Sequence, residues 1–562
     1  MLRLPAQHVA QWRRRAQGRP VDKGEPMSTR SKTLRTWTAA ALGLSFVAAA
    51  CGGSGSDSAE GGEVVDKSAI KEALNATTTT AVGATTTAAT PEPKSMDEWE
   101  KLWDTQRAAM VQRIKDNKWG ISADGKTITG SEGFTVDLTK CVNNWSDTQG
   151  IENGLVKISQ AMAQSGTYAD YGNIGKGIST VINHYNDKGV FKDVNGKPVK
   201  IDYKITDDGY DATRTIPIVD EFLDSVKPFE IWTLGSPATL KTYDKINQYC
   251  IPQLSSMTGH DAWGDPVYHP WTTGAPRPTY STEAVLWATF LEQHIDEFPK
   301  DRKIVVAALA QNNDFGKLYS AAFKNAIAAS PKLKDRVDFQ LESIEAQAPT
   351  VIDPMTTLAA KNPDMWISML AGVQCTQIVV EAANNGMKEK VKYKFMPQTC
   401  PGAGAIGKEK LGGDGMAGDG WLIMDPGVKD LKDPTLQSDP YVKWLRDELT
   451  KAGINPDSST QLGDGVNYLF PVLQAMRCAS DLGGITRSRV LVCYRVMKMD
   501  SPMLKWGMPL HMDGNKDAFV AEAARFSKWD AKKQTYENVS DLFLLDGKTK
   551  NCRWILAKAA CE

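Results

Sequence analysis

The spacing of apolar residues from about residue 154 onward predicts strands that alternate with helices. Short apolar runs such as LVKISQAM are typical of buried strands, and the stretches between them carry apolar residues at helical spacing. The expected strands of this first block are 155–162, 197–208, 229–234 and 251–256, and its expected helices are 171–186, 211–225 and 235–250. Such alternation predicts parallel sheets with right-handed crossovers.

A proline-rich passage at 269–278 interrupts the pattern, and a second block of the same kind follows. Its expected helices are 279–297, 317–329, 355–361 and 375–385, and its expected strands are 303–308, 337–341, 365–368 and 393–396. A further helix is expected over 464–479, then a helix, a return crossing and a hairpin around Trp529, and finally a disulfide-closed helix at 552–562. Two such blocks predict an α/β fold of two doubly wound parallel-sheet lobes.

The segment that precedes the first block is expected to form an extension packed on the main body. Ser95 and Glu98 have the spacing of a capping box, and apolar residues follow at helical spacing over 99–114. Asp124-Gly125 then indicates a hairpin turn.

The first fifty residues are predicted to be an export signal. Basic residues between 30 and 35 precede an uncharged stretch at 36–50, which ends in small residues directly before Cys51. This order resembles the bacterial lipobox, which implies cleavage before Cys51 and attachment of lipid to its sulfur; the alternative is an ordinary secretory signal with an incidental cysteine. The stretch is too short for a comfortable membrane-spanning helix, and Met27 is a candidate for the true start.

Residues 51–95 are expected to form a lipid-anchored, disordered tether. The segment is rich in Gly, Ser, Ala and Thr, and such a composition cannot bury enough apolar surface to offset chain entropy. A flexible spacer would let an anchored domain reach a permease.

Charge argues against a nucleic-acid partner. The net charge of the whole chain is −1, but the first fifty residues hold nine Lys and Arg and two Asp and Glu, so the remainder carries 57 basic and 65 acidic residues. That acidic balance of −8 argues against the basic face that phosphates require and predicts contact with a membrane through the lipid anchor only; the alternative is a basic patch that forms only in the folded chain.

The nine cysteines favour an oxidising compartment. If Cys51 carries lipid, an even number remains for disulfides, and many pairings stay open. Sequence proximity favours Cys552–Cys561 and Cys478–Cys493, which leaves Cys375–Cys400 and Cys141–Cys250. No metal site is expected, because there is no CxxC or HExxH and the six histidines are scattered.

Seven stretches in a fixed order carry a resemblance to a known family. They are 165–189, which contains SGTYADYG, then 207–223, 231–239, 251–259, 312–327, 363–387 and 391–402. Over about residues 153–545 the chain resembles the branched-chain amino-acid and amide type of periplasmic binding proteins, the type I solute-binding lipoproteins of ABC transporters. The resemblance implies two lobes joined by three hinge crossings, with a ligand held in the cleft between them.

Candidate ligand-binding residues lie at the carboxyl ends of the strands, where open α/β sheets bind their ligands. Ser236 suits an N-cap and Pro237 a first helical residue, so the amides that follow suit a carboxylate or a polarised carbonyl; the alternative is that Ser236 only caps its helix. Loops that match the family's contact positions supply the other candidates, whereas His260 is expected to be structural. The full set is Tyr168, Ser236, Ala238, Thr239, Ser256, Met257, Thr258, Gly259, Phe315, Leu370, Ala371, Gly372, Gln398 and Thr399.

One departure from the family bears on the ligand. Amino-acid receptors of this type place an acid after the last of these strands to pair the ligand's ammonium, whereas this chain has no acid there before Glu409. An α-amino-acid ligand is therefore in doubt, with Asp314 as the candidate substitute. A GxGxxG match at 402–407 lies late in an exported chain, where a dinucleotide fingerprint does not belong.

These patterns predict a non-enzymatic lipoprotein, held outside the cytoplasmic membrane, that needs no cofactor. It would deliver a small polar solute, such as an amino acid or amide, to the permease subunits of an ABC importer. The alternatives are a ligand-sensing receptor component without transport and an exported enzyme on the same scaffold. The expected organisation is a signal peptide at 1–50, the tether at 51–95, the extension at 96–152, an N-lobe at 153–274, a C-lobe at 275–420, a return to the N-lobe at 421–500, and a C-lobe tail with the disulfide-closed end at 501–562.

Overall fold

The computed structural model describes residues 91–400 and 402–562. The predicted signal peptide at 1–50, the lipidation residue Cys51 and the predicted tether up to residue 90 lie outside the described residues. Within the described ranges, no helix combines the length and the apolar character needed to cross a membrane.

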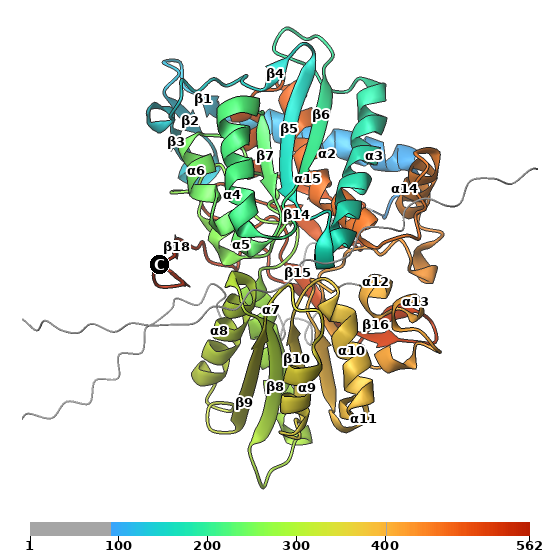
Figure 1. Cartoon of the computed structure of the whole chain (residues 1–562). Coiled ribbons are helices and arrows are strands. Elements are labelled where there is room, and N and C mark those ends of the chain that lie inside the picture. The colour runs from blue at the N-terminus through green and yellow to red at the C-terminus, as the bar shows by residue number, and fades with distance from the viewer. Residues whose placement is uncertain (1–90, 401) are drawn as a thin grey trace, which may run out of the picture. The chain divides into compact units, whose positions relative to one another are not determined.

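The first lobe is built on a sheet whose parallel strands lie in the order β6–β5–β7 (Figure 1). β5 comes first along the chain, and β6 and β7 lie on its two sides. The carboxyl ends of the three strands therefore form a topological switch point, where such sheets bind ligands. The strands are β5 (Leu155–Met162), β6 (Lys200–Asp207) and β7 (Glu230–Thr233), with the short antiparallel β4 (Ile151–Glu152) beside the start of β5. The helices are α3 (Gly172–Lys188), α4 (Ala212–Glu221), α5 (Ser236–Leu240) and α6 (Tyr243–Gln248).

The fourth strand expected at 251–256 does not form. Pro252 has no N–H to give to a strand ladder, the N–H of Leu254 donates instead to the Glu230 carboxylate at 3.2 Å, and Ser255 has a left-handed backbone (φ 55°). Isolated bridges to neighbouring segments take the place of continuous pairing.

The second lobe has a larger sheet, in which five parallel strands in the order β9–β8–β10–β11–β12 are followed by antiparallel β15 and β16. The strands are β8 (Ile304–Gln311), β9 (Val337–Ile344), β10 (Met365–Met369), β11 (Tyr393–Met396), β12 (Leu422–Asp425), β15 (Ala523–Asp530) and β16 (Thr535–Asn538), and β17 (Phe543–Leu544) pairs with the start of β15. The helices are α7 (Tyr280–Gln293), α8 (Asp314–Ala329), α9 (Ile352–Ala359), α10 (Gln374–Asn384), α11 (Met387–Lys390), α12 (Gly402–Ile406) and α13 (Lys408–Leu411). The strand order is again that of a doubly wound sheet, as the alternating pattern predicts.

The chain passes between the two sheets three times. It leaves the first lobe between α6 and α7, returns after β12, and leaves again after a hairpin that precedes β15. The returning segment contains α14 (Pro440–Lys451), α15 (Gln461–Asp481), α16 (Arg487–Arg495), β13 (Lys498–Asp500) and β14 (Pro509–His511). α15 packs closely on α3: a Cβ on Gly465 would lie 2.2 Å from the carbonyl oxygen of Ile174, so only glycine fits this approach.

The extension forms the expected helix and hairpin. α2 (Met96–Asp116) begins after Ser95, whose hydroxyl accepts a hydrogen bond from Glu98 N at 3.2 Å. The Glu98 carboxylate accepts from Lys94 N at 2.8 Å instead of from Ser95 N, so the reciprocal bond of the capping box moves by one residue. The antiparallel strands are β1 (Gly120–Ile121), β2 (Thr127–Thr129) and β3 (Thr135–Asp137).

Within the described ranges the eight cysteines form four disulfides. Two are the pairs that sequence proximity favoured, Cys478–Cys493 and Cys552–Cys561, and two are the pairs that this choice left over, Cys141–Cys250 and Cys375–Cys400. The prediction of a helix at 552–562 is wrong. β18 (Trp554–Ile555) and β19 (Ala560–Cys561) pair as a short hairpin, because the last disulfide joins the two ends and Ala559 turns the chain with a left-handed backbone (φ 47°).

Candidate ligand-binding cleft

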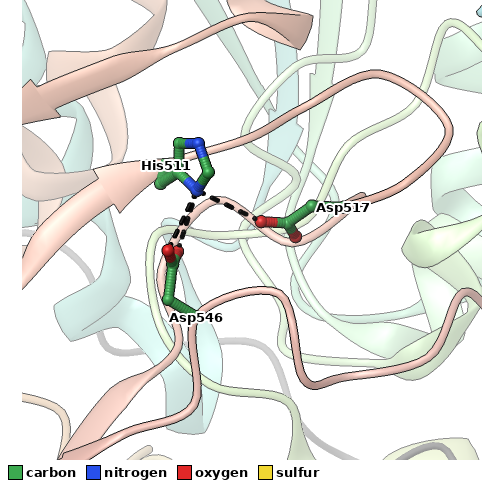
Figure 2. A group of neighbouring side chains, drawn as sticks. All are labelled: His511, Asp517 and Asp546. Atoms are coloured by element: carbon green, nitrogen blue, oxygen red, sulfur yellow. Dashed lines mark hydrogen bonds and ion pairs between the residues drawn. The ribbon is translucent and has the colours of Figure 1, made fainter. Parts of the chain in front are cut away.

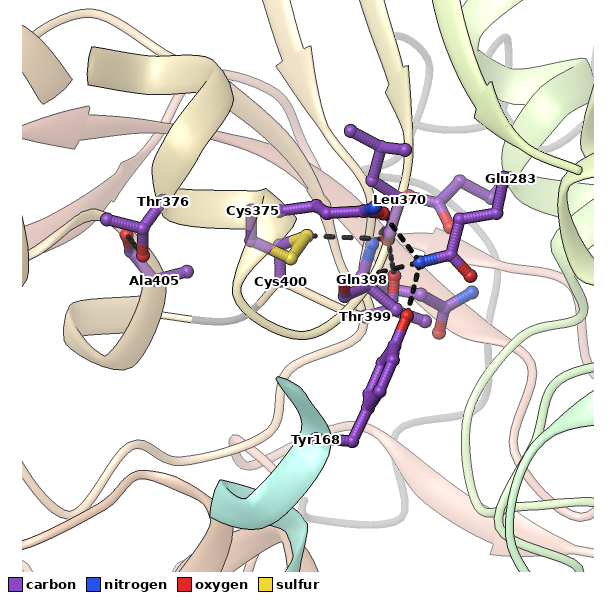
Figure 3. The surroundings of a disulfide bond; sticks show 12 residues. Tyr168, Glu283, Leu370, Cys375, Thr376, Gln398, Thr399, Cys400 and Ala405 are labelled. Carbon is purple, nitrogen blue, oxygen red and sulfur yellow. Dashed lines mark hydrogen bonds between the residues drawn. A yellow bond between two sulfur atoms is a disulfide. The ribbon is translucent and has the colours of Figure 1, made fainter. Parts of the chain in front are cut away.

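The carboxyl ends of the strands in the two lobes meet at a cleft. Tyr168 lies in the loop after β5, and its hydroxyl accepts a hydrogen bond at 2.6 Å from Nε2 of Gln311, the last residue of β8. Gln347, from the second lobe, also donates to the carbonyl of Gly209 at 3.1 Å. Figure 3 shows Tyr168 reaching from the first lobe toward the strand ends of the second.

Gly372 allows this close approach. It follows β10 and has a left-handed backbone (φ +66°), which favours glycine. A Cβ at this position would lie 2.6 Å from a ring carbon of Tyr168. The two lobes therefore touch where any larger residue would hold them apart.

A small cavity lies between the lobes. Its lining includes several aromatic residues, one cation and one acid. The aromatic residues are Tyr171, Tyr210, Tyr280, Phe315 and Tyr468, and the charged residues are Arg277 and Asp464. Aromatic walls supply apolar contact area, and a few polar groups among them fix the orientation of a ligand.

Arg277 lies on the first crossing between the lobes and is buried. Its guanidinium donates to Asp464 Oδ1 at 3.2 Å and to the Gln398 carbonyl at 3.3 Å, and it lies 5.0 Å from the ring centroid of Tyr468. Burial opposes its charge, but Tyr468 and Asp464 outweigh that cost and raise the pKa of Arg277. The wall of the cavity therefore holds a buried Arg277–Asp464 ion pair that is fixed from both lobes, and Arg277 Nε has no hydrogen-bond partner within the described residues.

Asp464 supplies the acid. It lies in the first turn of α15, and burial raises its pKa although Arg277 acts in the opposite direction. Amino-acid receptors of this type have an acid after the strand that corresponds to β11, and this chain has none there. Asp464 supplies a carboxylate from another segment, but it is already paired with Arg277.

Three buried polar atoms around the first crossing have no hydrogen-bond partner within the described residues. They are Arg277 Nε, Gln398 Oε1 and Asn467 Oδ1. Buried polar groups are normally hydrogen-bonded, so these three atoms leave hydrogen-bonding capacity unused around the first crossing.

Two further cavities adjoin the first and share residues with it. One is lined by Tyr168 and Gly372 among others, and it shares Tyr171, Thr399 and Gln461 with the central cavity. The other includes Gln398 and shares Arg277 and Asp464. The three cavities therefore adjoin one another around the same loops.

Seven of the fourteen residues predicted from the sequence line these cavities: Tyr168, Met257, Phe315, Ala371, Gly372, Gln398 and Thr399. The other seven are buried nearby and bond or pack within the protein: Ser236, Ala238, Thr239, Ser256, Thr258, Gly259 and Leu370. Leu370, for example, accepts from the Thr399 hydroxyl at 2.8 Å beside the Cys375–Cys400 disulfide (Figure 3).

The expectation that Ser236 is an N-cap is wrong. Gly235 is the N-cap of α5, Ser236 is the first helical residue, and its hydroxyl shares a 2.8 Å hydrogen bond with that of Thr258. Thr258 in turn contacts the hydroxyl of Tyr280 at 3.5 Å. Ser236 thus takes part in a side-chain network that leads to a cavity residue.

His260 is placed as expected. Its Nδ1 accepts from Ala262 N at 3.1 Å, and its ring lies 4.5 Å from that of Trp554, so it supports the protein interior.

Sequence reasoning missed Arg277 and Tyr280 because they lie in or next to the proline-rich passage, which carries no helix or strand pattern. It also missed Tyr171, Tyr210 and Tyr468, although the first lies in the quoted SGTYADYG stretch. A lone arginine among prolines near a lobe boundary was the one available signal.

The model of the periplasmic binding protein family matches residues 156–534. Similar solved structures include a fatty acid ABC transporter substrate-binding protein from Thermomonospora curvata, at 16% identity and a TM-score of 0.57, covering 75% of this chain and 96% of that one. A branched chain amino acid ABC transporter protein from Thermus thermophilus with bound valine matches at 16% identity and a TM-score of 0.57, over 69% of this chain and 96% of its own.

A third structure is a solute binding protein of an ABC transporter from Rhodopseudomonas palustris in complex with 3,4-dihydroxy benzoic acid. It matches at 16% identity and a TM-score of 0.55, over 71% of this chain and 99% of its own. The chain matches no curated protein. At these identities the solved structures establish the fold.

Proposed function

The chain belongs to the periplasmic binding protein family, as a solute-binding protein of ABC transporters, and we propose that its solute is a small organic carboxylate with an aromatic or aliphatic body. This proposal rests on the buried Arg277 guanidinium at the wall of a cavity with aromatic residues between the lobes. Guanidinium matches a carboxylate with two parallel hydrogen bonds, and tyrosine and phenylalanine faces suit a planar or branched apolar group.

The ligands of similar proteins support this class. Valine, 3,4-dihydroxy benzoic acid and the fatty acid named for the Thermomonospora curvata protein differ in their bodies, but each carries a carboxyl group. Asp464 would meet an ammonium only by leaving Arg277, whereas Arg277 keeps an Nε–H that is unpartnered among the described residues and that a carboxylate could accept from while the pair stays intact. We therefore place non-amino carboxylates ahead of amino acids and amides.

Capture would work by closure. The open lobes would bind the carboxylate at Arg277 on the crossing, and closure would then bury its body between the tyrosines of the first lobe and Phe315 of the second. The bound solute shifts the population toward the closed form, which the permease subunits of an importer would recognise.

We also place the protein outside the cytoplasmic membrane, held by lipid on Cys51. Four disulfides support an oxidising compartment. Substitution of Cys51 by Ala should release the protein from the membrane fraction into the medium, while a Cys51-intact chain should incorporate a labelled fatty acid.

The ligand class is tested with matched acid and amide pairs on the purified chain. Benzoate, 3-phenylpropionate, hexanoate and valine are compared with benzamide, 3-phenylpropionamide, hexanamide and valinamide by calorimetry and thermal shift. We expect at least one acid to bind, its amide to bind at least ~10-fold more weakly, and Arg277→Gln to remove the difference. Arg302→Gln is the matched control, because Arg302 pairs with Asp364 at an exposed site just before the start of β8, at the opposite end of that strand from the cleft.

Equal binding of an acid and its amide would contradict the role of Arg277 but leave the transport assignment intact. Failure of all the acids and amides to bind would contradict the ligand class. Arg277→Lys provides a second variant that keeps the charge beside Asp464, in case the glutamine variant does not fold.

A further inference from the structure

A second cluster of polar residues lies near the last crossing between the lobes, and none of its members lines the cavities of the cleft. It joins His511, at the end of β14, with Asp517 in the following turn and Asp546 just after β17 (Figure 2). One potential ligand atom from each residue lies within 4.8 Å of the others. The members come from two segments, which explains why no local motif indicated them.

The geometry around His511 differs from that of an ordinary ion pair. Its Nδ1 atom faces three carboxylate oxygens: Asp546 Oδ1 at 3.1 Å, Asp546 Oδ2 at 3.0 Å and Asp517 Oδ2 at 3.5 Å. A single N–H can make one well-directed hydrogen bond, so it cannot serve all three. His269 shows the contrast, because its two nitrogens each meet one carboxylate, Asp244 at 2.7 Å and Asp265 at 2.9 Å.

Asp517 supplies an independent observation. The residue is 2% exposed, and its Oδ2 atom has no hydrogen-bond partner within the described part of the chain. Figure 2 shows this carboxylate pointing toward His511. Its other oxygen accepts from Phe519 N at 3.3 Å, which fixes the orientation. A buried carboxylate oxygen without a donor is costly unless a cation faces it.

The surroundings hold the cluster in place and add negative charge. Glu522 is buried, and its two carboxylate oxygens accept from Gly547 N at 2.7 Å and Thr549 N at 3.1 Å, so it fixes the turn that carries Asp546. Asp513, four residues before Asp517, pairs with Arg113 at 2.8 Å.

We propose that His511, Asp517 and Asp546 bind a divalent zinc-like cation. A tetrahedral ion with bonds of about 2.0–2.1 Å holds its ligand atoms about 3.3 Å apart, and the His511 Nδ1 distances to Asp546 Oδ2 and Asp517 Oδ2 bracket that value. Imidazole nitrogen with carboxylate oxygen suits zinc, whereas calcium and magnesium prefer sites built of oxygen alone. Water would complete the coordination.

The cation would act as a structural link. β14 belongs to the hairpin that leaves the first lobe, and Asp546 follows β17, which pairs with β15 in the sheet of the second lobe. Coordination of both segments by one ion would fasten the last crossing to the tail, independently of which solute the cleft binds.

The test uses the untagged full chain, stripped with EDTA and titrated with zinc chloride. We expect uptake of one zinc per chain, a rise in Tm of at least ~2 °C at saturation, and visible absorption bands of a four-coordinate site with cobalt chloride. Calcium chloride and magnesium chloride at equal concentration should raise Tm by less. His511→Gln and Asp546→Asn should each weaken zinc binding by at least ~10-fold.

Asp546 is exposed, so its variant tests the site without disturbing the interior. His294→Gln is the matched control, since His294 pairs with the single carboxylate of Glu297 at 2.6 Å, and it should bind zinc like the parent. The proposal fails if the parent takes up no stoichiometric zinc, or if both site variants bind zinc as tightly as the parent. Equal or stronger binding of calcium would overturn the choice of cation.

Discussion

The hydroxyl of Tyr168 accepts a 2.6 Å hydrogen bond from Gln311, and this bond joins the two lobes at the edge of the cleft. Tyr168 also stacks on Tyr210 at 4.0 Å between ring centroids, so its ring is held independently of the hydroxyl. The bond can therefore be removed without disturbing the aromatic packing beneath it.

Tyr168→Phe should weaken solute binding by about 2- to 10-fold, because the closed form loses one hydrogen bond worth about 0.5–1.5 kcal/mol and the open form loses none. Calorimetry with the best acid measures the affinity, and small-angle scattering measures closure. Tyr249→Phe is the control, since Tyr249 bonds to Asp224 at 3.4 Å within the first lobe. Unchanged affinity in the Tyr168 variant would show that the bond does not contribute to closure.

Gly372→Ala should have a larger effect on closure. The new methyl group would lie 2.6 Å from the Tyr168 ring and would hold the lobes apart. We expect solute affinity to fall by at least ~10-fold and the scattering radius with solute to stay near that of the open form. Gly386→Ala shares the left-handed backbone (φ +79°) but meets only Lys390 at 3.9 Å, so it reports the backbone cost alone. Equal losses in both variants would refute the steric argument.

The regular elements were predictable from the sequence because their apolar spacing is local. β5 and α3 follow directly from alternating and helical patterns, and so do most strands of the second lobe. The segment at 251–256 has the composition of a strand, but it does not form one because the N–H of Leu254 donates to Glu230. Residue spacing does not reveal that hydrogen bond.

The candidate site was predictable only in part, for the same reason. Loops after strands could be placed at the cleft by their order, which located Tyr168 and Phe315. The pairing of Arg277 with Asp464 brings together residues 187 positions apart, and no local pattern encodes it. Similarly, the single nitrogen of His511 between Asp517 and Asp546 depends on how the tail folds back.

The stability of the protein should fall as pH rises from about 4.5 to 8. Burial raises the pKa of Glu283 to about 8, although Tyr319 and Gln398 donate hydrogen bonds to it. A carboxyl whose pKa is raised on folding favours the folded state while protonated, and that contribution disappears as pH passes the folded pKa. Glu230 has a pKa raised to about 8 by burial as well, so it adds to the trend.

Glu283→Gln should flatten this dependence, because the amide stays neutral at every pH. Melting curves at pH 5, 6.5, 8 and 9 measure the effect, and Glu389→Gln, at a side chain 66% exposed, is the control. Parallel curves for the parent and the Glu283 variant would contradict the assignment.

Trp103→Ala should destabilise the first lobe, although the residue belongs to the extension. Trp103 is fully buried, and its indole N–H donates to the Asp500 carbonyl at 3.0 Å. Loss of such a side chain costs about 3–5 kcal/mol of unfolding free energy. Urea unfolding should show that loss, with a smaller one for the partly exposed Trp119→Ala on the same extension. A negligible effect would mean that the extension is dispensable for folding.

The disulfides should contribute unequally. Cys141 and Cys250 are 109 positions apart, whereas Cys552 and Cys561 are 9 apart. Loop-closure entropy predicts about 5 kcal/mol for the longer loop and about 2.6 kcal/mol for the shorter one. The double variant Cys141→Ser/Cys250→Ser should therefore lower the urea midpoint more than Cys552→Ser/Cys561→Ser.

Cys250 is also held by a hydrogen bond that the Cys141→Ser/Cys250→Ser variant leaves intact. Trp145 donates to the Cys250 carbonyl at 2.8 Å, so the extension stays attached to the end of α6 by more than the sulfur bridge. Trp145→Phe in the Cys141→Ser/Cys250→Ser background removes that attachment and should cost a further ~1 kcal/mol. Equal loss of stability in Cys552→Ser/Cys561→Ser and Cys141→Ser/Cys250→Ser would show that chain entropy does not determine which disulfide contributes more. The contact between the tail hairpin and His260 would then be the explanation to test.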